Sequence, residues 1–241
     1  MAELVAQIRP FRPEDTKDVT FAIGKSNMEL LAVANTKGIF HIFTLTIWIA
    51  LSSIFVQYMQ WWPKVDHGYL GYLSPLPAFA CVAVPIFALV DWINRPYFEE
   101  LSQQVLRNAH LSDISGHYAQ SPSSGFWILD YGDRFVGLIA VDAYQPEANR
   151  TSDTVIIRHF YVEEPYRAAG VQQDLLEHAI RHVFNSDPTV QRVETTTSEL
   201  TRYAQKVLSD LGFRLAERQQ RVGILGWQLE RRVLERSDWN S

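Results

Sequence analysis

Charged positions are distributed unevenly along the chain. Between Gly38 and Val90 the only charged side chains are Lys64 and Asp66, which leaves two uncharged runs at residues 39–63 and 68–90. An α-helix rises about 1.5 Å per residue, so about 20 apolar residues cross a hydrocarbon core of about 30 Å. Both runs reach that length, and we predict a transmembrane helical hairpin over residues 38–94.

Aromatic residues gather around the short connector of this hairpin, where an interfacial belt would meet the lipid headgroups: Tyr58, Trp61, Trp62, Tyr69 and Tyr72. Pro85 interrupts the second run, although membrane helices tolerate such kinks. Two alternatives to a spanning hairpin are a helix pair buried in a soluble core and a hairpin that dips into one leaflet.

The remaining positions alternate between strand-like and helix-like periods. A strand at 4–11 and a helix from Pro13 to about residue 34 precede the hairpin, and a helix beginning at Pro96 and a shorter one at 112–118 follow it. Further strands are predicted at 126–130, 134–141, 154–162, 190–195, 213–215 and 224–229, with helices at 170–184 and 199–211. We expect residues 1–37 and 95–241 to form one domain into which residues 38–94 are inserted.

Composition excludes several function classes. The net charge is −5 and no long basic run occurs, so nucleic acid is not an expected partner. The single cysteine, Cys81, allows neither an intrachain disulfide nor a CxxC pair. His178 and His182 stand four apart on one helix without an evident third ligand, so no metal is predicted. The N-terminus lacks the hydrophobic core of a cleaved signal peptide.

The segment Tyr166 to Gln172 joins a predicted strand to a predicted helix. Backbone amides at such a junction can point at an anion, and the helix start adds partial positive charge. Gly170 would let the main chain approach a ligand closely, and Arg167 would add a full positive charge. The arrangement is typical of phosphate or diphosphate binding, although a plain turn would have the same sequence features.

These residues read RAAGVQ, which resembles the signature of the GNAT acetyltransferase superfamily: Arg or Gln, two residues, Gly, one residue, then Gly or Ala. The resemblance extends to IRPFRPED, GFWILDYGDRFVGLIAV, VIIRHFYVEEPYRAAGVQQDLLEHAI and VETTTSELTRYAQKVLSDLGF. The inserted apolar hairpin followed by DISGHYAQSPSSGFWI is similar to the camello-like N-acetyltransferase branch, whose members are membrane-bound.

The resemblance implies an α+β fold with a mixed, mostly antiparallel sheet flanked by helices. It implies acetyl-CoA bound in a wedge between two parting parallel strands, without a metal. The pantetheine would follow the backbone at Tyr161 and Val162, and the diphosphate would rest on the loop formed by Arg167, Ala168, Ala169, Gly170, Val171 and Gln172. The expected protein is a membrane-anchored N-acetyltransferase acting on a small amine, an amino-acid conjugate or a protein amine. The alternative is a non-catalytic membrane adaptor or acyl-CoA sensor.

Three residues flank the expected reaction cleft as candidate general bases: His159, Glu163 and Glu164. A hydrogen-bonded strand histidine and a solvated acidic turn are the structural alternatives. The sequence departs from the family at Gln172, whose side chain must turn outward to leave the backbone accessible, and at Leu208, where a tyrosine often serves as the acid. We interpret Tyr203 as a packing residue.

Four basic residues lie near the domain-side ends of the hairpin, against Lys64 alone in the connector: Lys25, Lys37, Arg95 and Arg107. The positive-inside rule therefore favours a cytosolic domain. We expect a two-helix protein of a cellular membrane, with the endoplasmic reticulum as one candidate and the lipid bilayer as a partner.

Overall fold

The structure, a computed structural model, describes residues 6–63, 71–107, 111, 113–143 and 153–239. The hairpin connector and the loop after residue 143 therefore lie outside the described residues. The chain divides into two compact units. Unit 1 comprises residues 1–27, 101–222 and 226–241, and unit 2 comprises residues 28–100 and 223–225.

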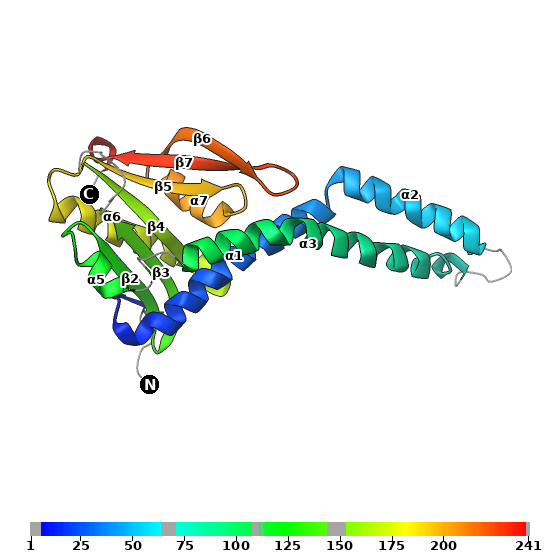
Figure 1. Ribbon diagram of the computed structural model, residues 1–241, viewed down its shortest axis with the longest axis horizontal. Helices are drawn as coiled ribbons and strands as arrows, with labels where there is room; N and C mark the ends of the chain where they lie inside the picture. Colours follow the sequence, from blue (N-terminus) through cyan, green and yellow to red (C-terminus); the bar gives the residue numbers. More distant parts are fainter. Residues whose placement is uncertain (1–5, 64–70, 108–110, 112, 144–152, 240–241) are drawn as a thin grey trace. The chain divides into compact units, whose positions relative to one another are not determined.

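Unit 1 is built on a seven-stranded sheet of order β1-β2-β3-β4-β5-β7-β6 (Figure 1). The strands are β1 (Ala6–Pro10), β2 (Gly125–Tyr131), β3 (Arg134–Asp142), β4 (Thr154–Val162), β5 (Arg192–Ser198), β6 (Arg214–Val222) and β7 (Trp227–Glu235). All neighbouring pairs are antiparallel except β4 and β5, which are parallel. The predicted mixed, mostly antiparallel sheet is confirmed.

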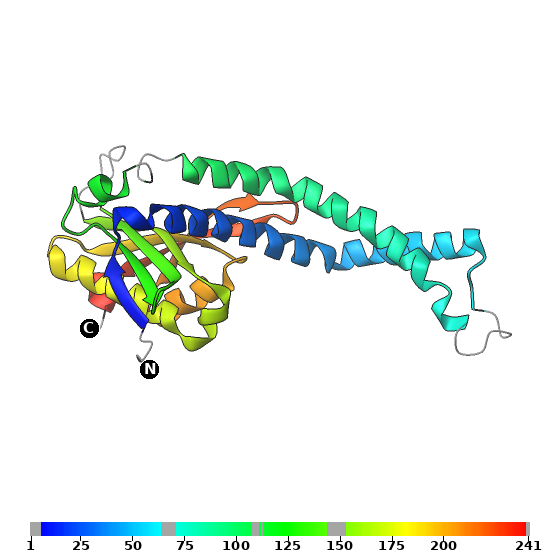
Figure 2. The same ribbon diagram turned by 90° about the horizontal axis from the view of Figure 1, so that it is seen from below.

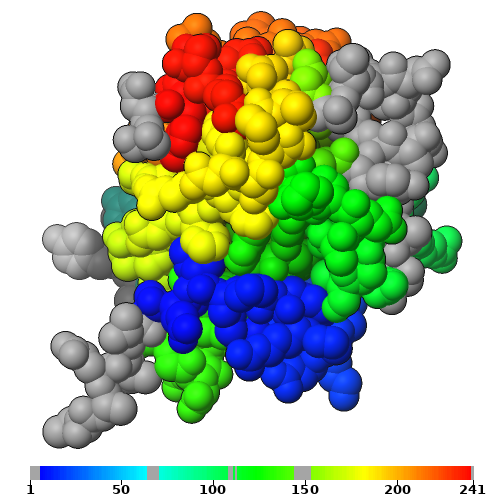
Figure 3. All heavy atoms as spheres, turned by 90° about the vertical axis from the view of Figure 1, so that its left-hand side faces the viewer, coloured from blue at the N-terminus to red at the C-terminus, as the bar shows by residue number. Residues whose placement is uncertain are grey.

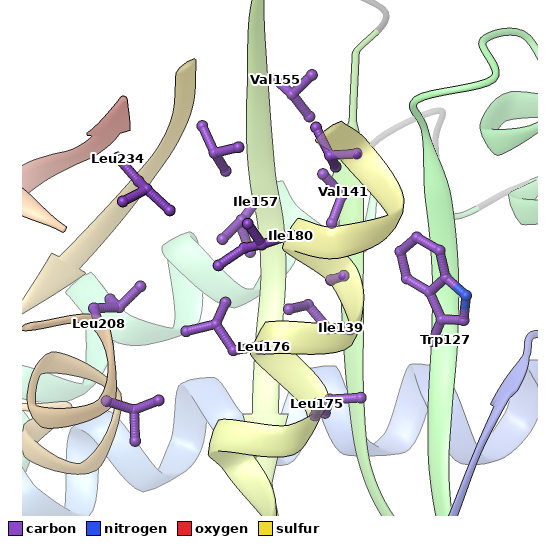
Figure 4. Packing of buried hydrophobic residues seen from close by; sticks show 14 of the residues in the cluster. Trp127, Ile139, Val141, Val155, Ile157, Leu175, Leu176, Ile180, Leu208 and Leu234 are labelled. Atoms are coloured by element: carbon purple, nitrogen blue, oxygen red, sulfur yellow. The ribbon is translucent and has the colours of Figure 1, made fainter. Parts of the chain in front are cut away.

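One face of the sheet carries the larger core, under α6 (Val171–Ser186) and α7 (Arg202–Asp210). In α6 the buried residues follow a helical period and pack on Ile139 and Ile157 of the central strands (Figure 4). The opposite face is covered by the first turns of α1 (Thr16–Ile39) and by α5 (Ile114–Tyr118), over Leu138, Ala140 and Tyr161.

The C-terminal segment closes unit 1 against the end of α6. The Arg236 guanidinium donates to the carbonyl oxygens of Phe184, Val190 and Asp187, and the Trp239 ring lies 6.4 Å from that of Phe184. Figure 3 shows the two segments side by side, α6 in yellow and the C-terminal residues in red. The short helix η4 (Arg236–Asp238) is thereby fixed to the α6 side.

Unit 2 contains the end of α1, then α2 (Ile42–Met59) and most of α3 (Leu76–Leu106) (Figure 2). Two helical segments are long and apolar enough to cross a membrane, at Ile42–Met59 and Gly71–Leu106, and each is only 11% buried. Large apolar side chains are accordingly exposed, among them Phe40, Ile42, Ile54 and Val84. Length and composition alone are weak evidence for a membrane span.

Helix α3 corrects one prediction. Pro96 does not begin a new helix but lies inside α3, as does Pro85. Each proline removes one backbone hydrogen bond, yet tertiary packing supplies most helical stability in proteins. Asn94 and Phe98, on either side of Pro96, are fully buried. The helix therefore continues from the apolar run into the amphipathic run without a break.

The closing strands are longer than predicted. We expected strands at 213–215 and 224–229, whereas β6 and β7 run over Arg214–Val222 and Trp227–Glu235. The added residues are mostly charged or polar, so they lack the alternation that marks a half-buried strand. Cross-strand ion pairs take its place: Arg231 lies 3.3 Å from Glu194 on β5 and 3.0 Å from Glu217 on β6.

Candidate active site

Strands β4 and β5 part in the middle of the sheet. Their register runs from Thr154 opposite Arg192 to Ile157 opposite Thr195 and ends there. Beyond that rung β5 stays paired with β7, from Thr196 opposite Arg231 to Ser198 opposite Leu229, while β4 stays paired with β3. The second half of β4 thus offers backbone groups on its β5 side to a ligand. The resemblance implies such a wedge, and the register agrees with it.

A β-bulge lies at the point where the strands part. His159 stands opposite Ala140 and Ile157 opposite Val141, so Arg158 is an extra residue on β4. Bulges bend a strand and change the direction in which a side chain points, and they are frequent next to active sites. Here the bulge directly follows the last rung that β4 shares with β5.

The loop after β4 leads from the wedge to the N-terminus of α6. A short helix, η3 (Glu164–Ala169), ends at Gly170, which has φ +79°. Glycine suits this left-handed conformation, and a Cβ built on Gly170 would meet nothing within 4 Å. The N-cap of α6 is Gly170 itself, so no side chain caps the first turn. The N–H groups of Val171 and Gln172 have no acceptor within the helix, which fits an anion beside this loop.

Arg167 turns from the loop toward the mouth of the wedge. Its Nε donates to the carbonyl oxygen of Val162 at 2.7 Å, and its guanidinium carbon lies 4.0 Å from the centre of the Tyr203 ring. The carbonyl that ends β4 is therefore occupied by Arg167 in this structure. The centre of the Tyr161 ring lies 5.7 Å from the same guanidinium carbon.

Gln172 does not turn outward as expected. Its Nε2 donates to the carbonyl oxygen of Arg167 at 3.0 Å, so the side chain bends back along the loop. Its Oε1 is buried without a hydrogen-bond partner in the part of the chain that the structure describes. The bend leaves the side of the loop above Gly170 open. Ala168 and Ala169, which complete the loop, are exposed.

The three candidate bases lie in different surroundings. The Glu163 carboxylate pairs with the ammonium of Lys25 on α1 at 2.5 Å, and Glu164 is exposed in the first turn of η3. His159 is half-buried on β4, next to the bulge. Alternation along β4 puts His159 on the same face as Tyr161, under α1 and α5. Of the three, His159 is the one beside the parting point.

Leu208 is buried in the core under α6 and α7, so its position offers no acid. Tyr203, which we interpreted as packing, has its hydroxyl 3.5 Å from the carbonyl oxygen of Phe160 on β4. The phenol thus reaches across the wedge from the first turn of α7. It both packs against β4 and lies beside the expected path of the ligand.

Sequence reasoning missed a polar cluster on the face covered by α1 and α5. The Asp142 carboxylate, 1% exposed, lies 3.1 Å from both Arg158 Nε and His117 Nε2. Tyr118 lies nearby, and burial followed by the Asp142 charge raises the pKa of its phenol. These residues come from β3, β4 and α5, and the one local signal was a carboxylate that ends an apolar strand.

A cavity of about 350 Å³ opens beside the parting point. It is lined by Ile156, Glu194, Thr195, Thr196, Glu217, Gln219 and Arg231. Val155 and Ile157 belong to the core under α6, so alternation turns Ile156 to the opposite face. The cavity therefore adjoins the wedge on the face away from α6.

Comparison with known proteins agrees with this geometry. Residues 86–213, more than half of the chain, match the acetyltransferase (GNAT) family. The fold is similar to that of an N-acetyltransferase from Staphylococcus aureus Mu50, at 12% identity and a TM-score of 0.52, over 96% of this chain and 98% of that chain. It is also similar to spermidine N-acetyltransferase from Vibrio cholerae, solved with CoA and spermine, at 10% identity and a TM-score of 0.50, over 97% and 96%.

No curated protein matches the chain. At such low sequence identities the solved structures indicate similarity of fold alone. The family match over residues 86–213 includes the wedge and the loop before α6. The chain belongs to the acetyltransferase (GNAT) family.

Proposed function

We propose that this protein is a membrane-anchored N-acetyltransferase that transfers an acetyl group from acetyl-CoA to an amine. The observation that carries the proposal is the parting of β4 and β5 after Ile157 and Thr195, next to a glycine loop that opens α6. A thioester carrier needs both parts: a strand edge for its amides and an anion site for its diphosphate.

The pantetheine amides would pair with the open edge of β4 at Tyr161 and Val162. The diphosphate would accept from the first N–H groups of α6, with Arg167 supplying a positive charge. Because Arg167 Nε now donates to the carbonyl oxygen of Val162, we propose that the incoming pantetheine takes over this acceptor. The guanidinium then turns toward the diphosphate, over a loop that has room above Gly170.

In the proposed reaction the amine nitrogen attacks the thioester carbonyl carbon, a C–N bond forms and the C–S bond breaks. His159 accepts the proton that the amine nitrogen loses, because it is the candidate base beside the bulge. The leaving CoA thiolate takes a proton from the Tyr203 hydroxyl or from water; this phenol reaches β4 across the wedge. Holding both reactants at one point supplies much of the rate.

The membrane part of the proposal rests on α2 and α3. In the most apolar window of each candidate span only 11% of the residues are buried, so large apolar side chains such as Ile42, Ile54 and Val84 are exposed. A bilayer would cover them. Burial inside a larger assembly and insertion into a single leaflet are the competing explanations. The basic residues near the domain-side ends favour a cytosolic domain with access to acetyl-CoA.

The test is CoA release from acetyl-CoA by detergent-solubilised protein with a panel of amines. We expect amine-dependent release in the unaltered protein and a loss of about tenfold or more in kcat/KM for Arg167→Ala. Arg134→Ala is the matched control, since Arg134 is exposed at the start of β3. Unchanged turnover in Arg167→Ala with an intact fold would remove Arg167 from the site.

A non-catalytic adaptor or acyl-CoA sensor is the second candidate. The observation in its favour is Gln172, which has a buried amide oxygen without a described partner where the family has Gly or Ala. Calorimetry with acetyl-CoA separates the candidates. Absence of binding favours the adaptor, and binding without turnover of any amine favours the sensor.

A further inference from the structure

The bulge residue Arg158 is held in place by a buried carboxylate. Asp142 is 1% exposed, and its Oδ2 accepts from Arg158 Nε and lies 3.1 Å from His117 Nε2. A buried charge is costly unless it is paired and hydrogen-bonded. The cluster meets this requirement with two partners from different elements, so the Arg158 side chain has a defined direction.

Among the described residues, Asp142 holds Arg158 through Nε alone. In the described residues no hydrogen bond is found for its two terminal nitrogens, and the side chain is 36% exposed. A guanidinium in this state presents parallel N–H donors, which match the two oxygens of a carboxylate. Since Nε is already bonded, a ligand would meet a fork that has lost part of its freedom before binding.

Arg158 also lies where an acceptor would arrive. It follows the last rung shared by β4 and β5, at Ile157 and Thr195. Its partner Asp142 shares a face with Leu138 and Ala140, under α1 and α5, as alternation along β3 requires. The 350 Å³ cavity opens on this same face, with Ile156 in its wall. The other face is filled by the core under α6 and α7.

We propose that Arg158 binds a carboxylate carried by the acceptor, so that the acceptor is an amino acid or a conjugate that keeps its carboxyl group. This inference rests on the proposed function, which puts the acetyl group at the same parting point. Asp142 and His117 are positioning residues that aim the guanidinium. Tyr118 of α5 lies beside them, within reach of the Asp142 and Arg158 charges, and His159 follows Arg158 on β4.

The cavity itself supports an acceptor with charges of both signs. Its lining includes Arg231, which lies 3.3 Å from Glu194 and 3.0 Å from Glu217. An amino acid would bring a carboxylate to Arg158 and an amino group toward the parting point. Arg158 thus separates carboxylated acceptors from plain amines.

The test measures binding of reaction products to the full chain in detergent, with CoA present and without it. Each probe pair differs by one carboxylate: N-acetylphenylalanine with N-acetylphenethylamine, N-acetylleucine with N-acetylisoamylamine, and N-acetylglycine with N-methylacetamide. We expect the carboxylated member to bind at least about tenfold more tightly in one pair or more. Arg158→Met should bring that ratio near one, and Arg158→Lys, which keeps the charge but not the fork, should give an intermediate ratio.

Arg134→Met is the matched control and should keep the full ratio, and thermal melting checks that each variant folds. The affinity for CoA should be the same in all of them. The inference is overturned by an affinity ratio near one for every pair in the unaltered protein, or by a ratio that survives in Arg158→Met. It is also overturned by a loss of CoA affinity in Arg158→Met, which would assign Arg158 to the cosubstrate. Carboxylate preference in a chain that binds no CoA would refute the proposed function and would leave Arg158 as a carboxylate-binding residue without an acetyl acceptor.

Discussion

Gly170 allows the proposed diphosphate site to be tested apart from stability. The residue has φ +79°, and a side chain built there would project into open space above the loop. Gly212, which ends α7, has a similar φ of +90° and is remote from the loop in sequence. A non-glycine residue in the left-handed region costs roughly 1–2 kcal/mol. Gly170→Trp and Gly212→Ala should therefore lower Tm by similar amounts, about 2–8 °C.

Their effects on acetyl-CoA should differ sharply. An indole at Gly170 would cover the N–H groups of Val171 and Gln172. Two charge-assisted hydrogen bonds of about 1.5–3 kcal/mol each would be lost, which is an affinity loss of at least about 100-fold. Calorimetry should therefore detect acetyl-CoA binding to Gly212→Ala and not to Gly170→Trp. Unaltered affinity in a folded Gly170→Trp protein would refute the assignment of the diphosphate to this loop.

Three further predictions concern the framework of the site and the anchor. Arg9 bonds Asp15 at 2.7 Å and Asp130 at 2.6 Å, so Arg9→Met should cost about 2–3 kcal/mol in urea unfolding at pH 7. The Arg9 hydrogen bond is the main cause that lowers the pKa of Asp15 from 3.8. The ionised Asp15 therefore contributes free energy of unfolding above about pH 4, and this contribution is lost as the pH falls further. The free energy of unfolding should accordingly depend less on acid pH in Arg9→Met than in the unaltered protein. A Cβ on Gly137 would lie 2.6 Å from the carbonyl oxygen of Tyr161, so Gly137→Ala should destabilise by about 1–3 kcal/mol and weaken acetyl-CoA binding. Gly24 lies in helix α1, where an added Cβ would meet nothing within 4 Å, so Gly24→Ala should instead raise the free energy of unfolding by up to about 1 kcal/mol. Equal effects of Gly137→Ala and Gly24→Ala would contradict the close packing of Gly137 on the end of β4. Ile49 of α2 is 53% exposed. If this helix spans lipid, Ile49→Lys should raise the carbonate-extractable fraction of the protein, because a lysine at the centre of a membrane helix costs about 2.5–3.5 kcal/mol. Ile49→Leu is the control, and equal extraction of the two variants would count against a span.

The strands and helices of the central sheet could be predicted because their pattern is local. Strand β4 has the predicted bounds, and α6 begins within one residue of the prediction. The ends of β6 and β7 could not be predicted, because their stability comes from ion pairs between strands, such as that of Arg231 with Glu217. A single sequence does not say which arginine will stand opposite which glutamate.

The candidate site divides in the same way. The loop around Gly170 was identified because its residues are contiguous and one of them needs a left-handed backbone. The cluster of His117, Asp142 and Arg158 was missed, because it joins three elements and depends on a bulge. A bulge moves one residue out of alternation, and no simple period reveals it. Tyr203 shows the same limit, since its distance to β4 depends on how α7 packs.

An experimental structure of the protein with CoA bound tests the central claim most directly. We expect the diphosphate within hydrogen-bond distance of the N–H groups of Val171 and Gln172. We also expect the pantetheine along Tyr161 and Val162, and the sulfur between β4 and β5 beyond the rung of Ile157 and Thr195. CoA bound elsewhere, or a wedge closed by side chains with the cofactor excluded, would contradict it.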